Sequence, residues 1–118
     1  MNACIHGLLT AALLLAALPG TAAVQVGEDS GRQLALARNK GSCTDCHQFP
    51  NDPLVETKAT VGPPISGIRA RFTNRIALTN FVKDPMAVNP DTIMPPYGRH
   101  RILTEREIDA IVDYLYTQ

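Results

Sequence analysis

Three side chains that could carry out chemistry stand within five positions of one another: Cys43, Cys46 and His47, in the order C-x-x-C-H. This spacing is typical of the attachment site of a c-type haem. The two thiols lie on one side of a helical turn, where each can form a thioether with one vinyl group of a haem. His47 follows four residues after Cys43 on the same side, so its imidazole can ligate the iron. We therefore predict one covalently bound haem c at this turn.

The same residues could have other uses. They could form half of a zinc site, a dithiol redox pair or a structural disulfide. A zinc site needs two more Cys or His ligands at a suitable spacing. The remaining candidates are Cys4, His6 and His100, and the first two lie in a segment that we expect to be removed. Haem attachment is therefore the preferred interpretation.

A proline-dense loop over residues 86–98 holds two methionines, which are candidates for the second side of the iron. Met94 stands between the turn signal Asn89-Pro90-Asp91 and a double proline, which would fix the loop in one shape. A lone methionine is more often core filler, and this is how we interpret Met86. His100 is a competing ligand, but it stands between two arginines and is expected at the surface.

A second rigid stretch, residues 62–68, reads Gly-Pro-Pro-Ile-Ser-Gly-Ile. A metal-bound histidine normally donates its other ring N–H to a carboxylate or a carbonyl. We expect a carbonyl of this stretch to accept from His47, and Pro63 is the favoured candidate. The alternative is a plain rigid loop.

Residues 1–23 differ from the rest of the chain. They contain no Asp, Glu, Lys or Arg, and residues 8–18 are almost entirely apolar. Pro19-Gly20 interrupts the apolar run, and small residues up to Ala23 follow. This pattern predicts a signal peptide that is cleaved after Ala23 and directs the chain to the periplasm. Because the segment before the apolar run lacks Lys and Arg, an uncleaved anchor is the alternative.

Export leaves Cys43 and Cys46 as the cysteines of the mature chain, and two thioethers would use both. Residues 24–118 then form one monohaem domain, with little core of its own unless a cofactor fills part of it. Eleven Lys and Arg balance eleven Asp and Glu, and no basic block suggests nucleic acid. No catalytic arrangement such as Ser-His-Asp or paired carboxylates is evident.

Three helices are expected. The weakest pattern covers residues 31–40, where four apolar residues follow one another. A second helix is expected over residues 74–83 and ends at Asp84-Pro85. The third covers residues 103–116 and starts with a capping box. Residues 48–61 read as a polar loop. The second helix should bury Ile76 or Ala77 with Leu78, Phe81 and Val82, and the third should bury Ile108, Ile111, Val112 and Leu115.

Taken in order, the haem motif, the Gly62-Pro63-Pro64-Ile65 segment and the loop from Asn89 to Pro95 resemble class I cytochromes c. Shorter stretches look closer to one branch, SoxX, the small monohaem subunit of the SoxAX complex of sulfur oxidation. The similar stretches are residues 31–35, 38–43, 81–85, 89–98 and 103–108.

The resemblance implies an all-α fold in which the first and last helices cross around a covalently bound haem. It also implies that His47 and Met94 ligate the iron from opposite faces. In that branch, a SoxA partner carries the haem at which thiosulfate is joined to a cysteine of a carrier protein. SoxX accepts the electrons and passes them to another cytochrome, as the non-catalytic subunit of an L-cysteine S-thiosulfotransferase. The alternative is a free-standing electron carrier without an enzymatic partner.

Overall fold

The computed structural model describes residues 30–118, so the expected signal peptide, with Cys4 and His6, lies outside the described residues. The described part is built from helices and loops and contains no strand, which confirms the expected all-α class. None of its helices is long and apolar enough to cross a membrane. The helices are α1 (Gly31–Leu36), α2 (Ile68–Arg71), α3 (Arg75–Lys83) and α4 (Glu105–Leu115), with short 3₁₀ turns η1 (Cys43–Asp45) and η2 (Pro85–Ala87).

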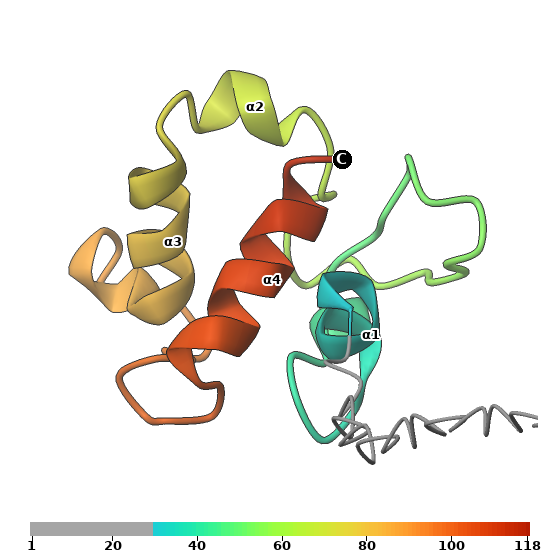
Figure 1. Ribbon diagram of the computed structural model, residues 1–118. Helices are drawn as coiled ribbons and strands as arrows, with labels where there is room; N and C mark the ends of the chain where they lie inside the picture. Colours follow the sequence, from blue (N-terminus) through green and yellow to red (C-terminus); the bar gives the residue numbers. More distant parts are fainter. Residues whose placement is uncertain (1–29) are drawn as a thin grey trace, which may run out of the picture.

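The first and last helices cross, as expected. Figure 1 shows α4 between α1 and α3, and α4 contacts both of these helices. At the crossing, a Cβ on Gly31 would lie 1.8 Å from the carbonyl oxygen of Ala110. A residue without a side chain is therefore required at the start of α1 for this close approach.

Helix α4 follows its sequence pattern closely. Thr104 is the N-cap, and its hydroxyl and amide exchange hydrogen bonds with Glu107 in the predicted capping box. The whole predicted apolar stripe is buried, and Ile108 and Val112 are fully enclosed. The predicted burial of α4 is confirmed. The buried residues of this helix are Ile108, Ile111, Val112 and Leu115.

Helix α1 is shorter than expected. It begins at Gly31, after a capping box between Ser30 and Gln33, but it ends at Leu36 instead of Lys40. In a longer helix the Leu34 carbonyl would accept from the amide four residues later. Here it accepts from Gly41, at 2.9 Å, because the chain turns back towards the haem motif. A hydrogen bond from the turn that follows therefore takes the place of the next helical bond.

Helix α3 ends at Lys83 as expected and begins one residue later than expected, with Asn74 as its N-cap. Its buried face was predicted only in part. Leu78 and Val82 are buried, but Ile76 is 67% exposed and Ala77 is also exposed. In a helix Ile76 lies about 200° around the axis from Leu78, so the two cannot share one face. The four-residue helix α2 was not predicted.

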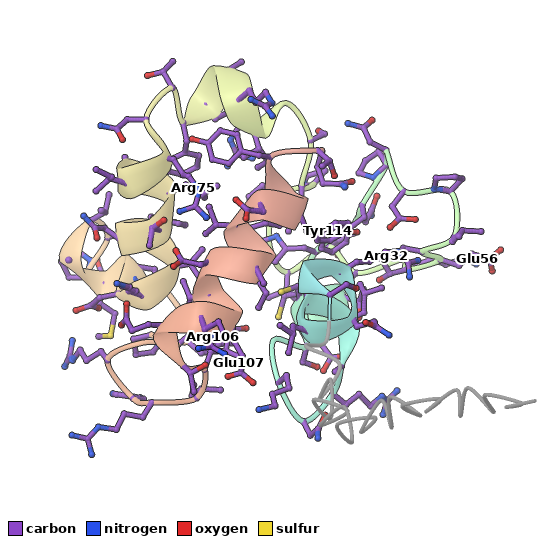
Figure 2. All side chains as sticks on the ribbon, viewed as in Figure 1. Arg32, Glu56, Arg75, Arg106, Glu107 and Tyr114 are labelled. Carbon is purple, nitrogen blue, oxygen red and sulfur yellow. The ribbon has the colours of Figure 1, made fainter. Side chains whose placement is uncertain are left out.

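The loop over residues 48–61 contains no helix or strand, as expected, but it is tied firmly to the helices. Asp52 is buried and accepts from Arg32 Nε at 2.6 Å and from the Tyr114 hydroxyl at 2.8 Å. Figure 2 shows Arg32 of α1 and Tyr114 of α4 near each other beside this loop. The Arg32 guanidinium lowers the pKa of Asp52 to about 2. Asp52 therefore joins the loop to both crossed helices.

Candidate cofactor site

A cavity of about 450 Å³ lies among α2, α3, α4 and the loops, which is a typical size for a small-molecule site. Its lining comes from segments that are far apart in the sequence. Most of the lining side chains are apolar, and the four predicted haem residues are among them. The lining includes Cys43, Cys46, His47, Ile65, Ile68, Phe72, Leu78, Phe81, Val82, Met94, Leu103, Ile111 and Leu115.

The Cys43–His47 segment forms a compact turn at this cavity. Its first three residues are the 3₁₀ turn η1, and the His47 amide donates to the Cys43 carbonyl at 2.8 Å. The preceding Ser42 has a left-handed backbone, with φ of 48°, and its hydroxyl donates to Asp45 at 2.5 Å. The expected helical turn is therefore present, and it brings both thiols and the imidazole to one cavity.

The Cys43 thiol lies in an environment that favours its protonated form. Burial raises the pKa of Cys43 to about 12, so the thiol is neutral near pH 7. Redox dithiols act through a thiolate whose pKa is lowered. Cys43 and Cys46 are also free thiols in the structure, not a disulfide. Within residues 30–118, no group of three His, Cys, Asp or Glu side chains is placed to hold a metal ion.

The ring of His47 is held from two sides. Its Nδ1 lies 2.6 Å from the Pro63 carbonyl oxygen, which confirms the predicted contact. Because a carbonyl can only accept, Nδ1 carries the hydrogen and Nε2 keeps a lone pair for a metal. A Cβ on Gly62 would come within 2.3 Å of the ring, so the ring lies directly on the Gly62 backbone. The Gly62 amide donates to the Cys46 carbonyl at 2.8 Å, which fixes this contact to the turn.

Met94 lines the same cavity from the proline-rich loop. It is partly buried, and its amide donates to the Thr92 hydroxyl at 3.2 Å. Tyr97 ties this loop to the other wall, because its hydroxyl donates to the Gly41 carbonyl at 2.6 Å. Burial raises the pKa of Tyr97 above its usual value, which favours the protonated hydroxyl that donates this bond.

The two competing candidates lie outside the lining. His100 is exposed, as expected for a surface histidine. Met86 is only partly buried and is not among the residues that line the cavity. The structure therefore brings Met94 to the cavity with the Cys-Cys-His turn and leaves the other two candidates away from it.

One cationic side chain and two exposed apolar side chains mark the edge of the cavity. Arg71, at the end of α2, is the only Lys or Arg among the described residues that line the cavity. Val61 and Ile93 also line the cavity, yet they are 60% and 79% exposed, so they stand at its mouth. The cavity is thus apolar inside, with one guanidinium at its edge.

These residues fit a haem. The apolar lining suits the flat porphyrin, and the two thiols are at the spacing that haem attachment needs. His47 presents one nitrogen lone pair, and Met94 supplies a soft sulfur. Arg71 can pair with a carboxylate of the haem.

The fold is also that of a known cytochrome. The chain matches a chain in the crystal structure of SoxXA from P. pantotrophus with a TM-score of 0.66 and 25% sequence identity. The match covers 74% of this chain and 77% of that chain. The chain therefore resembles a SoxX-type class I cytochrome c. No protein-family model and no curated sequence matches it.

For this SoxX-like chain, the sequence identified the chemical groups but not their supports. The Tyr97–Gly41 link joins residues 56 positions apart, and nothing local to either residue indicates it. Arg71 was missed because α2 was not expected, and Asp52 was assigned to a loop without a role. The lack of a side chain at Gly62, next to the proline pair, was a usable signal for close packing against His47.

Proposed function

We propose that this SoxX-like chain binds one haem c covalently, through thioethers at Cys43 and Cys46. His47 and Met94 would hold the haem iron in this proposal. The main support for this proposal is that all four side chains line one apolar cavity, although Met94 is 47 positions from His47. When bound, the haem supplies an iron that can hold or release one electron.

The chain's own residues would shape that electron transfer. The Pro63 carbonyl and Gly62 fix the imidazole of His47, so that Nε2 is the ligating atom. The apolar lining keeps water away from the site. A methionine ligand leaves no open position for a substrate and raises the reduction potential. These features support electron acceptance more than substrate turnover.

The wider proposal is a periplasmic electron-transfer subunit of a SoxAX-type complex. Its partner would be a SoxA-type cytochrome, in a heterodimer that oxidatively conjugates thiosulfate to a cysteine of a carrier protein. This chain would take up the electrons and pass them to a downstream cytochrome. The similarity to SoxXA and the leader-like residues 1–23 support this assignment.

The test is purification of the tagged protein from the periplasm of thiosulfate-grown cells of the source organism. The eluate is run on a denaturing gel and stained for covalent haem. A second haem-bearing band in equal proportion is the expected result. A single small haem band would instead favour the free-standing carrier, and the thiosulfate role would be withdrawn.

A second experiment tests the ligand assignment. Met94→Ala should keep the covalent haem but abolish the weak near-infrared sulfur-to-iron band of the oxidised protein. Met86→Ala is the matched control, because Met86 lies outside the cavity lining, and it should keep the band. If the effects of the two variants are reversed, Met94 is not the ligand.

A further inference from the structure

We propose that Tyr97 is a positioning residue that keeps Met94 on the iron by tying the Met94 loop to the haem-attachment turn. The inference rests on the proposed function, because it takes Met94 as an axial ligand. Tyr97 itself touches neither the iron nor a substrate in this proposal. Its hydroxyl acts through the backbone of the two cavity walls.

The tie is one buried hydrogen bond. Tyr97 is 8% exposed, and its hydroxyl donates to the Gly41 carbonyl at 2.6 Å. Gly41 stands two residues before Cys43, and Tyr97 stands three residues after Met94. The bond therefore joins the wall that carries the haem-attachment turn to the wall that carries the proposed sulfur ligand. Both partners line the cavity.

The Gly41 end of the tie is anchored. The Gly41 amide donates to the Leu34 carbonyl of α1 at 2.9 Å, and the Ser42 amide donates to the Ala37 carbonyl at 3.1 Å. Helix α1 is in turn packed against α4. A group bonded to the Gly41 carbonyl is thus held against the crossed helices.

The Tyr97 end is stiff as far as Met94. The two intervening residues, Pro95 and Pro96, have fixed φ angles, and Pro96 is buried. The Tyr97 carbonyl also accepts from the Ile102 and Leu103 amides, at 2.9 and 3.1 Å. Because the Pro95-Pro96 link is stiff, a displacement of Tyr97 would also displace Met94.

This tie matters because a methionine sulfur is a neutral ligand that other ligands can replace. Loss of the hydroxyl leaves the Gly41 carbonyl without this donor in a buried place, which favours movement of the loop. Movement of the loop would withdraw Met94 from the place where it would hold the iron. An added ligand such as imidazole would then bind more readily.

The test is imidazole titration of the oxidised holoprotein, followed by loss of the near-infrared sulfur-to-iron band. Tyr97→Phe keeps the ring and removes only the hydroxyl. We expect its imidazole affinity to rise about tenfold, equivalent to about 1.4 kcal/mol. The reduction potential should fall as the methionine-bound fraction decreases.

Tyr116→Phe is the matched control. The Tyr116 hydroxyl also donates to a backbone carbonyl, that of Phe72 at 2.9 Å, in a partly buried setting. Its loss should leave the imidazole affinity unchanged, while denaturant unfolding reports the general cost of losing such a bond. If Tyr97→Phe binds imidazole no more tightly than Tyr116→Phe does, the positioning role is refuted.

Met94→Ala separates this inference from the proposed function. If that variant keeps the sulfur-to-iron band, the ligand assignment fails and the role of Tyr97 fails with it. If Met94→Ala loses the band but Tyr97→Phe behaves as wild type, the ligand assignment stands and only the positioning role is overturned.

Discussion

The α1–α4 crossing and the loop wall of the cavity, residues 61–65 and 89–97, are held together in different ways. The crossing consists of two helices with capping boxes, packed through fully buried apolar side chains. The loop wall has almost no regular structure, and scattered hydrogen bonds and prolines fix its shape. One region is stabilised by packing of its own residues, whereas the other borders a cavity.

This difference indicates where the cofactor contributes. Protein interiors are close-packed, and a cavity of about 450 Å³ is far larger than the voids of an ordinary core. The crossing has most of its packing partners within the chain, although Ile111 and Leu115 of α4 also line the cavity, so it should persist better without haem. The loop wall borders the cavity and has almost no regular structure of its own, so it should depend more strongly on haem.

Replacing both cysteines, Cys43→Ala with Cys46→Ala, should have the largest effect, because no thioether can then form. Haem staining after denaturing electrophoresis should detect no covalent haem. Haem staining that survives in this variant would refute the attachment site. In the haem-free protein, amide hydrogen exchange should be fast in residues 89–97 and slower in α4. Equal exchange rates in α4 and in residues 89–97 would contradict the expected difference between the crossing and the loop wall.

The same difference explains what could be predicted from sequence. Helix α4 is encoded locally, because its cap and its apolar period lie within residues 104–115. The α1 boundary could not be predicted, because it is set by the Gly41 amide reaching back to the Leu34 carbonyl. In α3, the apolar pattern predicted a wider buried face than the structure has, because Ile76 is exposed.

For the cavity, the sequence identified the groups that could touch a haem and one support, Pro63. The Gly-Pro pair and the need of a ligating histidine for an acceptor made that contact predictable. Tyr97, Arg71 and Asp52 act through contacts with residues distant in sequence, and a single sequence gives no local signal for such contacts.

Truncation of Ile108 tests the packed region. Ile108→Ala should lower the free energy of unfolding by about 2–5 kcal/mol, because the side chain is fully buried in α4. Ile76→Ala is the matched control at an exposed site and should change it by less than about 0.5 kcal/mol. Chemical denaturation of the holoprotein measures both. Similar losses in the two variants would contradict the assigned core.

Acid should weaken the attachment of the 48–61 loop to the crossing. The pKa of Asp52 is lowered to about 2 in the folded chain, mainly by Arg32, whereas an unfolded Asp has a pKa of about 3.9. Its contribution to stability is therefore complete above pH 4 and is lost as the pH falls towards 2. Asp52→Asn should flatten this part of the stability profile, measured by denaturation at several pH values. Asp91→Asn, at an exposed site, should retain the acid loss.

The smallest effect expected is at the first turn of α4. The Thr104 hydroxyl accepts from the Glu107 amide at 3.3 Å, and the Glu107 carboxylate accepts from the Thr104 amide at 2.8 Å. Thr104→Ala removes one half of this capping box, so the free energy of unfolding should fall by about 1 kcal/mol. Thr104→Ser keeps the hydroxyl and should restore most of that loss.

Glu107 makes this variant informative about both regions. Its carboxylate also accepts from Lys40 Nζ at 2.5 Å, in the turn that leads to Cys43. If the α1–α4 crossing and the loop wall are stabilised independently, Thr104→Ala will lower the free energy of unfolding. It will leave the sulfur-to-iron band and the imidazole affinity unchanged. A rise in imidazole affinity would instead show that loss of the α4 cap weakens the binding of Met94, through Lys40 and the turn that leads to Cys43. The crossing and the loop wall would then be energetically coupled.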